Sequence, residues 1–244
     1  MIQPKAAMAL AAMLCAPALQ AQDRVRLIAN GAFNPTKASF SETRSFTEFA
    51  ETATVRADYQ TKSAFAADVG VQVQLVNKLG AFVAYSSTSR DETGRFEASL
   101  PHPLYLSRPR SLDGDLTGYG YKEQALHLDL AYGEGRGHWD YALFAGLSRF
   151  SVQADLLDRV RYTQSYPYDS VTLGSAPARS VKDSPMGFNL GGRLDYRFGP
   201  SRRFGLGALL RFSRATGKLE ATETSTLEVD AGGLQAGIGA RLYF

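Results

Sequence analysis

The residues of this chain best suited to nucleophilic chemistry are a histidine and two serines in one proline-rich stretch. His102 lies in "PHPL" between two prolines, with Ser99 and Ser107 on either side. A hydrolase built on such a pair needs the serine within hydrogen-bond reach of the histidine and a carboxylate that orients the ring. Because the stretch has the composition of a loop, we expect no such geometry there.

Two further histidines offer acid–base chemistry. His127 and Asp129 are two residues apart in "QALHLDLAY", so an extended chain directs both side chains to the same face. They could act as an acid–base pair, but a hydrogen-bond network inside the fold is the simpler interpretation. His138 follows the glycine-rich "GEGRG", and we expect it in a solvated turn.

Acidic residues in two polar segments supply no defined metal site. Asp91 and Glu92 in "RDETGR", and Asp113 and Asp115 in "SLDGDLTG", lack the ligand spacing of a calcium loop. Glycine patterns such as "GYGYKE" lack the strand–turn–helix context of a phosphate site. The sequence therefore predicts no catalytic, cofactor-binding or metal-binding residue, and we expect the protein not to be an enzyme.

The elements that must position these residues alternate between apolar and polar side chains. Period-two alternation is the signal of strands with two different faces, and helical periodicity is scarce. The alternation recurs in "RVRLIANGAF", "DVGVQVQL", "AFVAYSS", "QALHLDLAY", "WDYALFAGLSRF", "FNLGGRLDYRF", "RRFGLGALLRFS" and "GGLQAGIGARLYF". We predict an all-β chain of eight strands. The segment 40–63 also alternates, either as an extension of the first two strands or as an extra pair that would give ten.

The connections between these strands alternate in length. Short connections fall near 76–80, 133–138 and 199–203, and long ones near 35–63, 88–120, 155–185 and 216–230. Outer-membrane barrels have this asymmetry, with short periplasmic turns and long extracellular loops. A soluble sandwich gives no reason for it. We therefore predict an antiparallel up-and-down transmembrane β-barrel with four long extracellular loops.

One face of the predicted strands carries polar and charged residues that a narrow barrel must enclose. In a soluble sandwich this would be the solvated face, but an eight-stranded barrel fills its interior with side chains. Arginine suits such an interior because its planar fork pairs with carboxylates. The expected lumen network consists of Arg26, Asp68, Gln72, His127, Asp129, Arg193, Asp195, Arg197, Arg211 and Arg241.

The N-terminal residues have the layout of a secretory signal peptide. Lys5 precedes an apolar run that ends in small residues, so we expect cleavage after Ala21, with Ala18 as the alternative. Cleavage after Ala21 leaves a barrel domain of residues 22–244. The single cysteine, Cys15, leaves with the signal, and the formal charge falls from +3 to +2 with the loss of Lys5. So weak a charge on an exported chain argues against nucleic acid as a partner.

The strand and loop pattern resembles the small outer-membrane β-barrel proteins of Gram-negative bacteria, of the OmpA transmembrane domain, OmpX and OmpW type. The sharpest local element is "LQAGIGARLYF", in which Ile238, Ala240, Leu242 and Phe244 alternate up to the last residue. The resemblance implies recognition of this ending by the outer-membrane assembly machinery, with periplasmic chaperones as transient partners and outer-membrane lipid around the barrel. The peptidoglycan-binding domain of OmpA has no counterpart, so a cell-wall tether is not implied.

Three functions follow from this interpretation. We expect a non-enzymatic structural or surface-interaction barrel whose long loops meet an extracellular ligand and whose lumen is closed by the Arg/Asp network. A narrow channel is the alternative, and the excess of arginine would favour anions. An envelope-lipid hydrolase that depends on His102 is the least favoured hypothesis.

Overall fold

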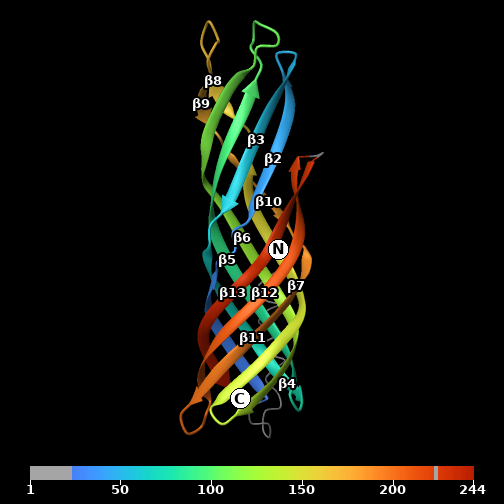
Figure 1. The fold of residues 1–244 in the computed structure, drawn as a ribbon, viewed down its shortest axis with the longest axis vertical. Coiled ribbons are helices and arrows are strands. Elements are labelled where there is room, and N and C mark those ends of the chain that lie inside the picture. The colour runs from blue at the N-terminus through green and yellow to red at the C-terminus, as the bar shows by residue number, and fades with distance from the viewer. Residues whose placement is uncertain (1–23, 223–224) are drawn as a thin grey trace, which may run out of the picture.

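The computed structural model describes residues 24–222 and 225–244, and their backbone is mostly β-strand. Eight strands pair antiparallel, each with the next, in the order β1 (Val25–Asn34), β4 (Ala64–Val76), β5 (Leu79–Leu100), β6 (Arg110–Arg136), β7 (Trp139–Leu157), β11 (Met186–Phe198), β12 (Phe204–Thr222) and β13 (Ser225–Tyr243). β13 returns to pair with β1, so the sheet closes into a barrel (Figure 1). The predicted eight-stranded barrel is confirmed. The predicted signal peptide, residues 1–21, lies outside the described residues.

The seam between β1 and β13 brings together segments from opposite ends of the chain. The backbones of Val25 and Phe244 exchange hydrogen bonds of 3.2 and 2.9 Å, and the pairing continues to Phe33 opposite Ala236. Closure pairs the edge strands with each other, which removes the unpaired N–H and C=O groups that an open sheet would expose.

The segment between β1 and β4 extends the barrel and adds no strand to the ring. β2 (Ser39–Glu48) and β3 (Glu51–Thr61) form a hairpin, and β3 pairs with the far part of β5, from Thr54 opposite Ser99 to Thr61 opposite Glu92. β4 pairs with the near part of the same strand. The alternative of ten ring strands is therefore wrong, and the extension is the correct interpretation of 40–63.

The long connections lie at one end of the barrel, as expected, but much of their length is strand. β5 and β6 are paired from Leu79 opposite Tyr132, at the short-turn end, to Leu100 opposite Arg110, so only 101–109 of the expected loop 88–120 is irregular. β12 and β13 likewise pair through most of 216–230. Segment 155–185 holds β8 (Arg161–Thr163), β9 (Thr172–Ser175) and β10 (Ala178–Asp183), and β10 pairs with β7. The four long connections are therefore present, and they consist largely of strand extensions and short added strands.

A belt of exposed apolar side chains surrounds the ring near the short turns. Its aliphatic members include Val69, Val83, Leu128, Leu130, Leu143, Leu190, Leu206, Leu210 and Ile238. Exposed aromatic residues border it at both levels: Tyr132, Trp139, Tyr141, Tyr196, Phe198, Phe204 and Phe244 towards the turns, and Phe33, Phe65, Tyr85, Phe188 and Phe212 on the other side. Aromatic girdles around an apolar band mark the lipid-facing surface of a transmembrane barrel. Among the described residues, no helix is long and apolar enough to cross a membrane.

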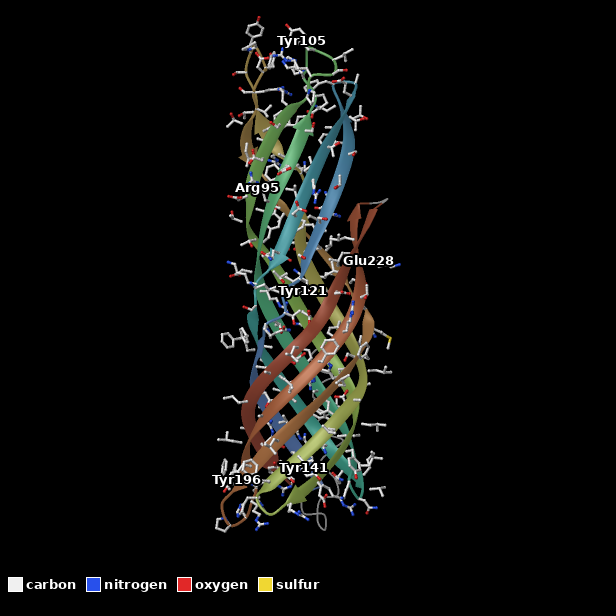
Figure 2. All side chains as sticks on the ribbon, viewed as in Figure 1. Arg95, Tyr105, Tyr121, Tyr141, Tyr196 and Glu228 are labelled. Carbon is white, nitrogen blue, oxygen red and sulfur yellow. The ribbon has the colours of Figure 1, made fainter. Side chains whose placement is uncertain are left out.

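The belt divides the molecule into two parts. We call the ring from the short turns up to Tyr85 and Phe188 the membrane half. We call the remainder the extracellular tower: β2, β3, β8 to β10 and the far parts of β5, β6, β7, β12 and β13. Figure 2 places Tyr105 at the far end of the tower and Tyr141 and Tyr196 at the opposite end of the molecule.

Candidate functional site

One buried carboxylate in the membrane half binds three guanidinium groups. Oδ1 of Asp195, on β11, accepts a hydrogen bond of 2.7 Å from Nε of Arg241. Its Oδ2 lies 3.2 Å from Nε of Arg193 and 3.4 Å from Nη1 of Arg26. These arginines come from β13, β11 and β1, which the ring brings to the same interior level. Charge-assisted contacts of this kind are among the stronger polar interactions in proteins, so Asp195 ties distant strands together.

A second carboxylate extends this cluster towards the short turns. Asp140, on β7, pairs with Arg197 and lies 3.6 Å from Nη2 of Arg26. The guanidinium groups of Arg197 and Arg26 lie 3.9 and 4.6 Å from the ring centre of Tyr243, which is buried. Cations over an aromatic face are attracted by its quadrupole. We define the periplasmic arginine cluster as Arg26, Arg193, Arg197 and Arg241 with Asp140 and Asp195.

The next interior layer is a closed ion pair. Nη1 of Arg211 donates to Oδ2 of Asp68 at 2.5 Å, and the other carboxylate oxygen accepts 2.8 Å from Nδ2 of Asn30. The guanidinium of Arg211 lies 5.8 Å from the ring centre of Phe82 and 5.5 Å from that of Phe144. Arg211 and Asp68 are both completely buried. Ion pair and aromatic rings together fill the lumen at this level.

His127 belongs to a hydrogen-bond network between strands. Its Nδ1 lies 2.7 Å from Oγ of Ser148, and its Nε2 lies 3.1 Å from Oγ of Ser86. Asn189 donates to Oγ of Ser148 at 2.9 Å and to Oδ1 of Asp129 at 2.7 Å. Both nitrogens of the buried imidazole are thus occupied by serines of neighbouring strands, which is the arrangement of a structural network.

A change of interior character occurs above the belt, around two buried charged residues of β5. Nη1 of Arg90 donates to the carbonyl of Thr36 at 2.8 Å. Glu92 is buried, and among the described residues neither of its carboxylate oxygens has a hydrogen-bond partner. Burial, reinforced by the nearby charge of Asp155, raises the pKa of Glu92 to about 8. The carboxyl is therefore protonated at neutral pH.

The far end of the tower is built by buried polar side chains that connect separate hairpins. Arg110 donates to the carbonyl of Pro101 at 2.6 Å, to Oε1 of Gln164 at 2.6 Å and to the carbonyl of Tyr168 at 3.1 Å. His102, also buried, accepts hydrogen bonds at Nδ1 from the backbone N–H groups of the residues two and three positions later, at 3.1 and 3.2 Å. These contacts fix loops 101–109 and 164–171 against each other.

This rigid end displays apolar side chains. The exposed set consists of Leu104, Tyr105 and Leu106 from one loop and Tyr166 from the other, and we call it the tip patch. Arg108 lies beside it, with its guanidinium 5.6 Å from the ring centre of Tyr105 and 3.2 Å from Oδ1 of Asp169. Exposed aromatic and aliphatic groups on a fixed backbone form a preorganised contact surface.

The structure places all ten residues of the expected lumen network inside the membrane half. Four are the arginines of the periplasmic arginine cluster, which also contains Asp195 and which Gln72 contacts through Arg193. Asp68 and Arg211 form the next layer, and His127 and Asp129 belong to the network around Ser148. Several interior residues were missed by sequence reasoning: Asp140, Ser86, Ser148 and the stacking rings Phe82 and Phe144. Alternation was the available signal for Asp140, which lies between the outward Trp139 and Tyr141.

The expected reactive residues are not brought together. His102 lies at the tower tip, away from the lipid belt, and Ser99 and Ser107 are both exposed. Glu92 points inwards, whereas Asp113 points outwards and pairs with Arg95 at 2.7 Å. In the described part of the chain, no group of three or more histidine, cysteine or acidic residues is arranged to hold a metal ion.

No family model and no curated protein matches this sequence. Solved structures that resemble it include the outer membrane protein OprG from Pseudomonas aeruginosa, at 14% identity and a TM-score of 0.48 over 93% of this chain and 99% of that one. Neisserial surface protein A resembles it at 13% identity and a TM-score of 0.43, over 90% of this chain and 97% of that one. The outer membrane protease OmpT from Escherichia coli resembles it at 12% identity and a TM-score of 0.44, over 94% of this chain and 99% of that one. Similarity at this level concerns the barrel fold and assigns no activity to this chain.

Proposed function

We propose that this protein is a non-enzymatic surface-interaction barrel of the Gram-negative outer membrane, which presents the tip patch to an extracellular protein. The membrane half anchors the molecule, and the tower holds the patch away from the lipid surface. The observation that carries the proposal is the support beneath the patch. Arg110 and His102 are buried there, and their polar atoms fix the loops that display Leu106 and Tyr166.

The chemistry of the patch favours a protein partner. Tyrosine, arginine and large aliphatic groups close together are typical of the centres of protein interfaces. Tyr105, Tyr166 and Leu106 expose 55, 80 and 75% of their surface, so they gain most from being covered. Arg108 supplies a charged donor at the rim. Because the backbone is already fixed, little conformational entropy is lost when a partner binds.

The filled interior argues for an anchor over a channel. Arg211 and Asp68 close the membrane half, and beyond them the tower contains an apolar core with Phe96, Leu116 and Leu156 fully buried. An ion would have to pass both regions. Bilayer recordings test this directly: we expect no steady conductance, and a reproducible open level would favour the anion-channel alternative.

The histidine geometry argues against hydrolysis. The Nδ1 of His102 is engaged by backbone N–H groups, and His127 is enclosed by the lumen. We expect His102→Ala to loosen the tip and to leave the lipid A pattern of the expressing strain unchanged. A wild-type-dependent change in lipid A that disappears in this variant would favour the hydrolase.

The test of the proposed function is the adherence of bacteria that display the protein to surfaces coated with extracellular proteins. We expect wild-type cells to adhere more than cells without the protein. The double variant Tyr105→Ser/Leu106→Ser should lose this gain while it assembles normally. The matched control is Arg95→Ser, which changes an exposed side chain on the wall of the tower. Equal adherence of the tip variant and wild type would refute the proposal.

A further inference from the structure

The loop that carries most of the tip patch is held in its turn by one histidine side chain. Nδ1 of His102 accepts hydrogen bonds of 3.1 Å from the backbone N–H of Leu104 and of 3.2 Å from that of Tyr105. Side chains that accept from backbone groups two or three positions later are usually those of aspartate, asparagine, serine or threonine, and they fix turns. Here the same connection is made by a residue type that changes its charge between pH 5 and 8.

These two hydrogen bonds specify the protonation state of the ring. A nitrogen that accepts a hydrogen bond carries no proton, so the neutral imidazole of His102 holds its proton on Nε2. Nε2 lies 3.8 Å from Oδ1 of Asp169 in the neighbouring loop, and it has no hydrogen-bond partner in the described part of the chain. An imidazolium has protons on both nitrogens and accepts nothing. Its Nδ1–H would face the two backbone N–H groups, donor against donor.

The charged groups around the ring give a protonated His102 a different partner. Asp169, which is half exposed, is 3.8 Å from the ring and pairs with Arg108 at 3.2 Å. Arg110 is buried beneath the loops, and a second cation beside it is unfavourable in a buried environment. Glu51, the first residue of β3, already accepts a hydrogen bond from a backbone N–H of the same loop. The charged ring is thus repelled from its buried position and drawn outwards to Asp169, in competition with Arg108.

We propose that His102 is a pH switch of the tip patch: in its neutral form it holds loop 101–109 in the conformation that displays the patch, and in its protonated form it releases the loop. The inference rests on the proposed function of the patch and adds its regulation. The closed loop fits only the neutral ring, whereas the open loop fits either form, so the open loop binds more protons and gains population as pH falls. The patch therefore binds its extracellular partner near neutral pH and releases it in acid, because its side chains then lose their common rigid backbone.

The direction of this switch is opposite to the effect of acid on Glu92, deeper in the tower. Protonation neutralises the buried carboxylate of Glu92, whereas protonation of His102 creates a charge at a buried position. Acid therefore loosens the tip and does not loosen the tower beneath it. The two effects separate in any measurement that resolves position along the chain.

Amide hydrogen exchange of the full-length protein in lipid nanodiscs tests the switch without a binding partner. The readout is the protection of loop 101–109, measured against an unstructured peptide of the same sequence at the same pH. A free imidazole gains its second proton near pH 6.5, so acidification from pH 7.5 to pH 5 favours the open loop by at most about thirtyfold. We expect protection of the loop to fall about tenfold over this interval, with no fall in the tower segment 112–116. Constant protection of the loop would overturn the proposal.

A matched substitution separates the switch from a purely structural role of His102. Asparagine carries an acceptor oxygen at the position of Nδ1 and does not titrate. His102→Asn should therefore keep the loop protected at pH 7.5 and show no fall at pH 5, whereas His102→Ala, which lacks the acceptor, should give low protection at both. His138→Asn, in an exposed turn at the opposite end of the molecule, is the control and should retain the full response. A fall in His102→Asn equal to that of wild type would refute the assignment to this residue.

Adherence at the same two pH values connects the switch with the proposed function. Wild-type cells should adhere less at pH 5 than at pH 7.5, and cells with His102→Asn should adhere equally at both. If exchange shows the switch but no cells adhere at either pH, the proposed function fails and the switch stands. If cells adhere but protection of loop 101–109 does not change with pH, the switch fails and the proposed function stands.

Discussion

The membrane half and the extracellular tower are built from the same strands with opposite distributions of polarity. In the membrane half, charged side chains such as Asp195 lie inside and leucines such as Leu128 face lipid. In the tower, aromatic and aliphatic side chains such as Phe96 lie inside, and Arg95 and Asp113 form the outer surface. The solvent around each part, hydrocarbon or water, determines which face of an unbroken strand must be apolar.

β5 shows the exchange within one strand. Its inward positions are Phe82, Ala84, Ser86, Thr88, Arg90 and Glu92, followed by Phe96, Ala98 and Leu100. Its outward positions are apolar at Val83 and Tyr85 and polar beyond them, for example at Ser89 and Asp91. The outward face of β5 therefore becomes polar after Tyr85, and the inward face becomes apolar again only from Phe96, beyond a polar stretch from Ser86 to Glu92.

A backbone irregularity accompanies the exchange on the neighbouring strand. The pairing of β5 with β6 shifts between Glu92 and Gly94, where β6 contains an extra residue. Gly118 lies at this bulge with a φ of +79°, a conformation that residues with a side chain rarely adopt. A bulge resets which side chains face inwards and adds twist, so the apolar core of the tower begins directly after it.

The largest expected effect comes from breaking the polar interior of the membrane half. Asp195→Ala leaves Arg26, Arg193 and Arg241 without their shared carboxylate, and removal of one partner from a buried ion pair costs about 3–5 kcal/mol. Urea unfolding in lipid, followed by the fluorescence of the single tryptophan, Trp139, measures the loss. Asp195→Asn, which keeps the shape and one acceptor oxygen, should lose less. Equal stability of Asp195→Ala and wild type would contradict this role of the network.

The stability of the tower should depend on its apolar core, so truncation of a buried aliphatic side chain should destabilise it. Leu116→Ala creates a cavity at a side chain that is 1% exposed, and such truncations cost about 2–5 kcal/mol. We expect protease cleavage of the tower at lower urea concentrations, with the Trp139 transition unchanged. The control is Leu147→Ala on the lipid face of β7. If the Trp139 transition shifted as much as the cleavage midpoint, the two parts would form one cooperative unit.

The stability of the tower should depend on pH through Glu92, which lies near the boundary between the two parts. Its pKa in the folded protein is about 8, against 4.5 for an unperturbed glutamate. The folded state therefore binds more protons than the unfolded state between these values, so tower stability is greatest below pH 4.5 and falls as pH rises towards 8. Urea-dependent proteolysis at pH 5, 7 and 9 measures this trend. Glu92→Gln should flatten it; an unchanged pH dependence would assign it to another group.

The smallest effect is expected on the outer wall of the tower. Arg95 and Asp113 form an ion pair of 2.7 Å, but both side chains are about 60% exposed. Pairs in water contribute about 0–1 kcal/mol. Asp113→Ala should thus shift the cleavage midpoint only slightly, and less in 1 M salt than in 0.1 M salt. A loss as large as that of Asp195→Ala would mean that burial is not what separates the two kinds of pair.

The alternation of apolar and polar residues was enough to predict most of the fold from the sequence. Because side chains on a strand point to opposite faces in turn, the position of Arg193 two residues before Asp195 was enough to place both inside. The same rule predicted the interior position of Asp68 and Arg211. Alternation does not predict which interior side chains are close to one another. That Asp195 binds arginines from β1 and β13 follows only from the closed ring.

The tower was missed because its alternation has the reverse polarity. In "RFEASL" the apolar Phe96, Ala98 and Leu100 alternate with charged and polar residues, as a strand requires. Charge and nearby prolines suggested a loop, since the apolar side chains had no evident core to join. The core exists because β3, β6 and β7 come together above the membrane, and the partners of Arg110 in distant loops depend on that assembly.

The continuous pairing of β5 with β6 also has a mechanical consequence. These strands run from the two short turns at the periplasmic surface to the loop that carries most of the tip patch, and their pairing shifts only once, between Glu92 and Gly94 (Figure 1). Hydrogen bonds in a sheet lie across the strand direction, so a pull along the strands on the loop that joins β5 to β6 loads in shear the ladder that holds this pair to its neighbours β4 and β7. Tension applied by a bound surface would pass through this ladder into the barrel wall and the lipid around it. A cell held by such a contact would be held through a rigid strut and not through a flexible tether.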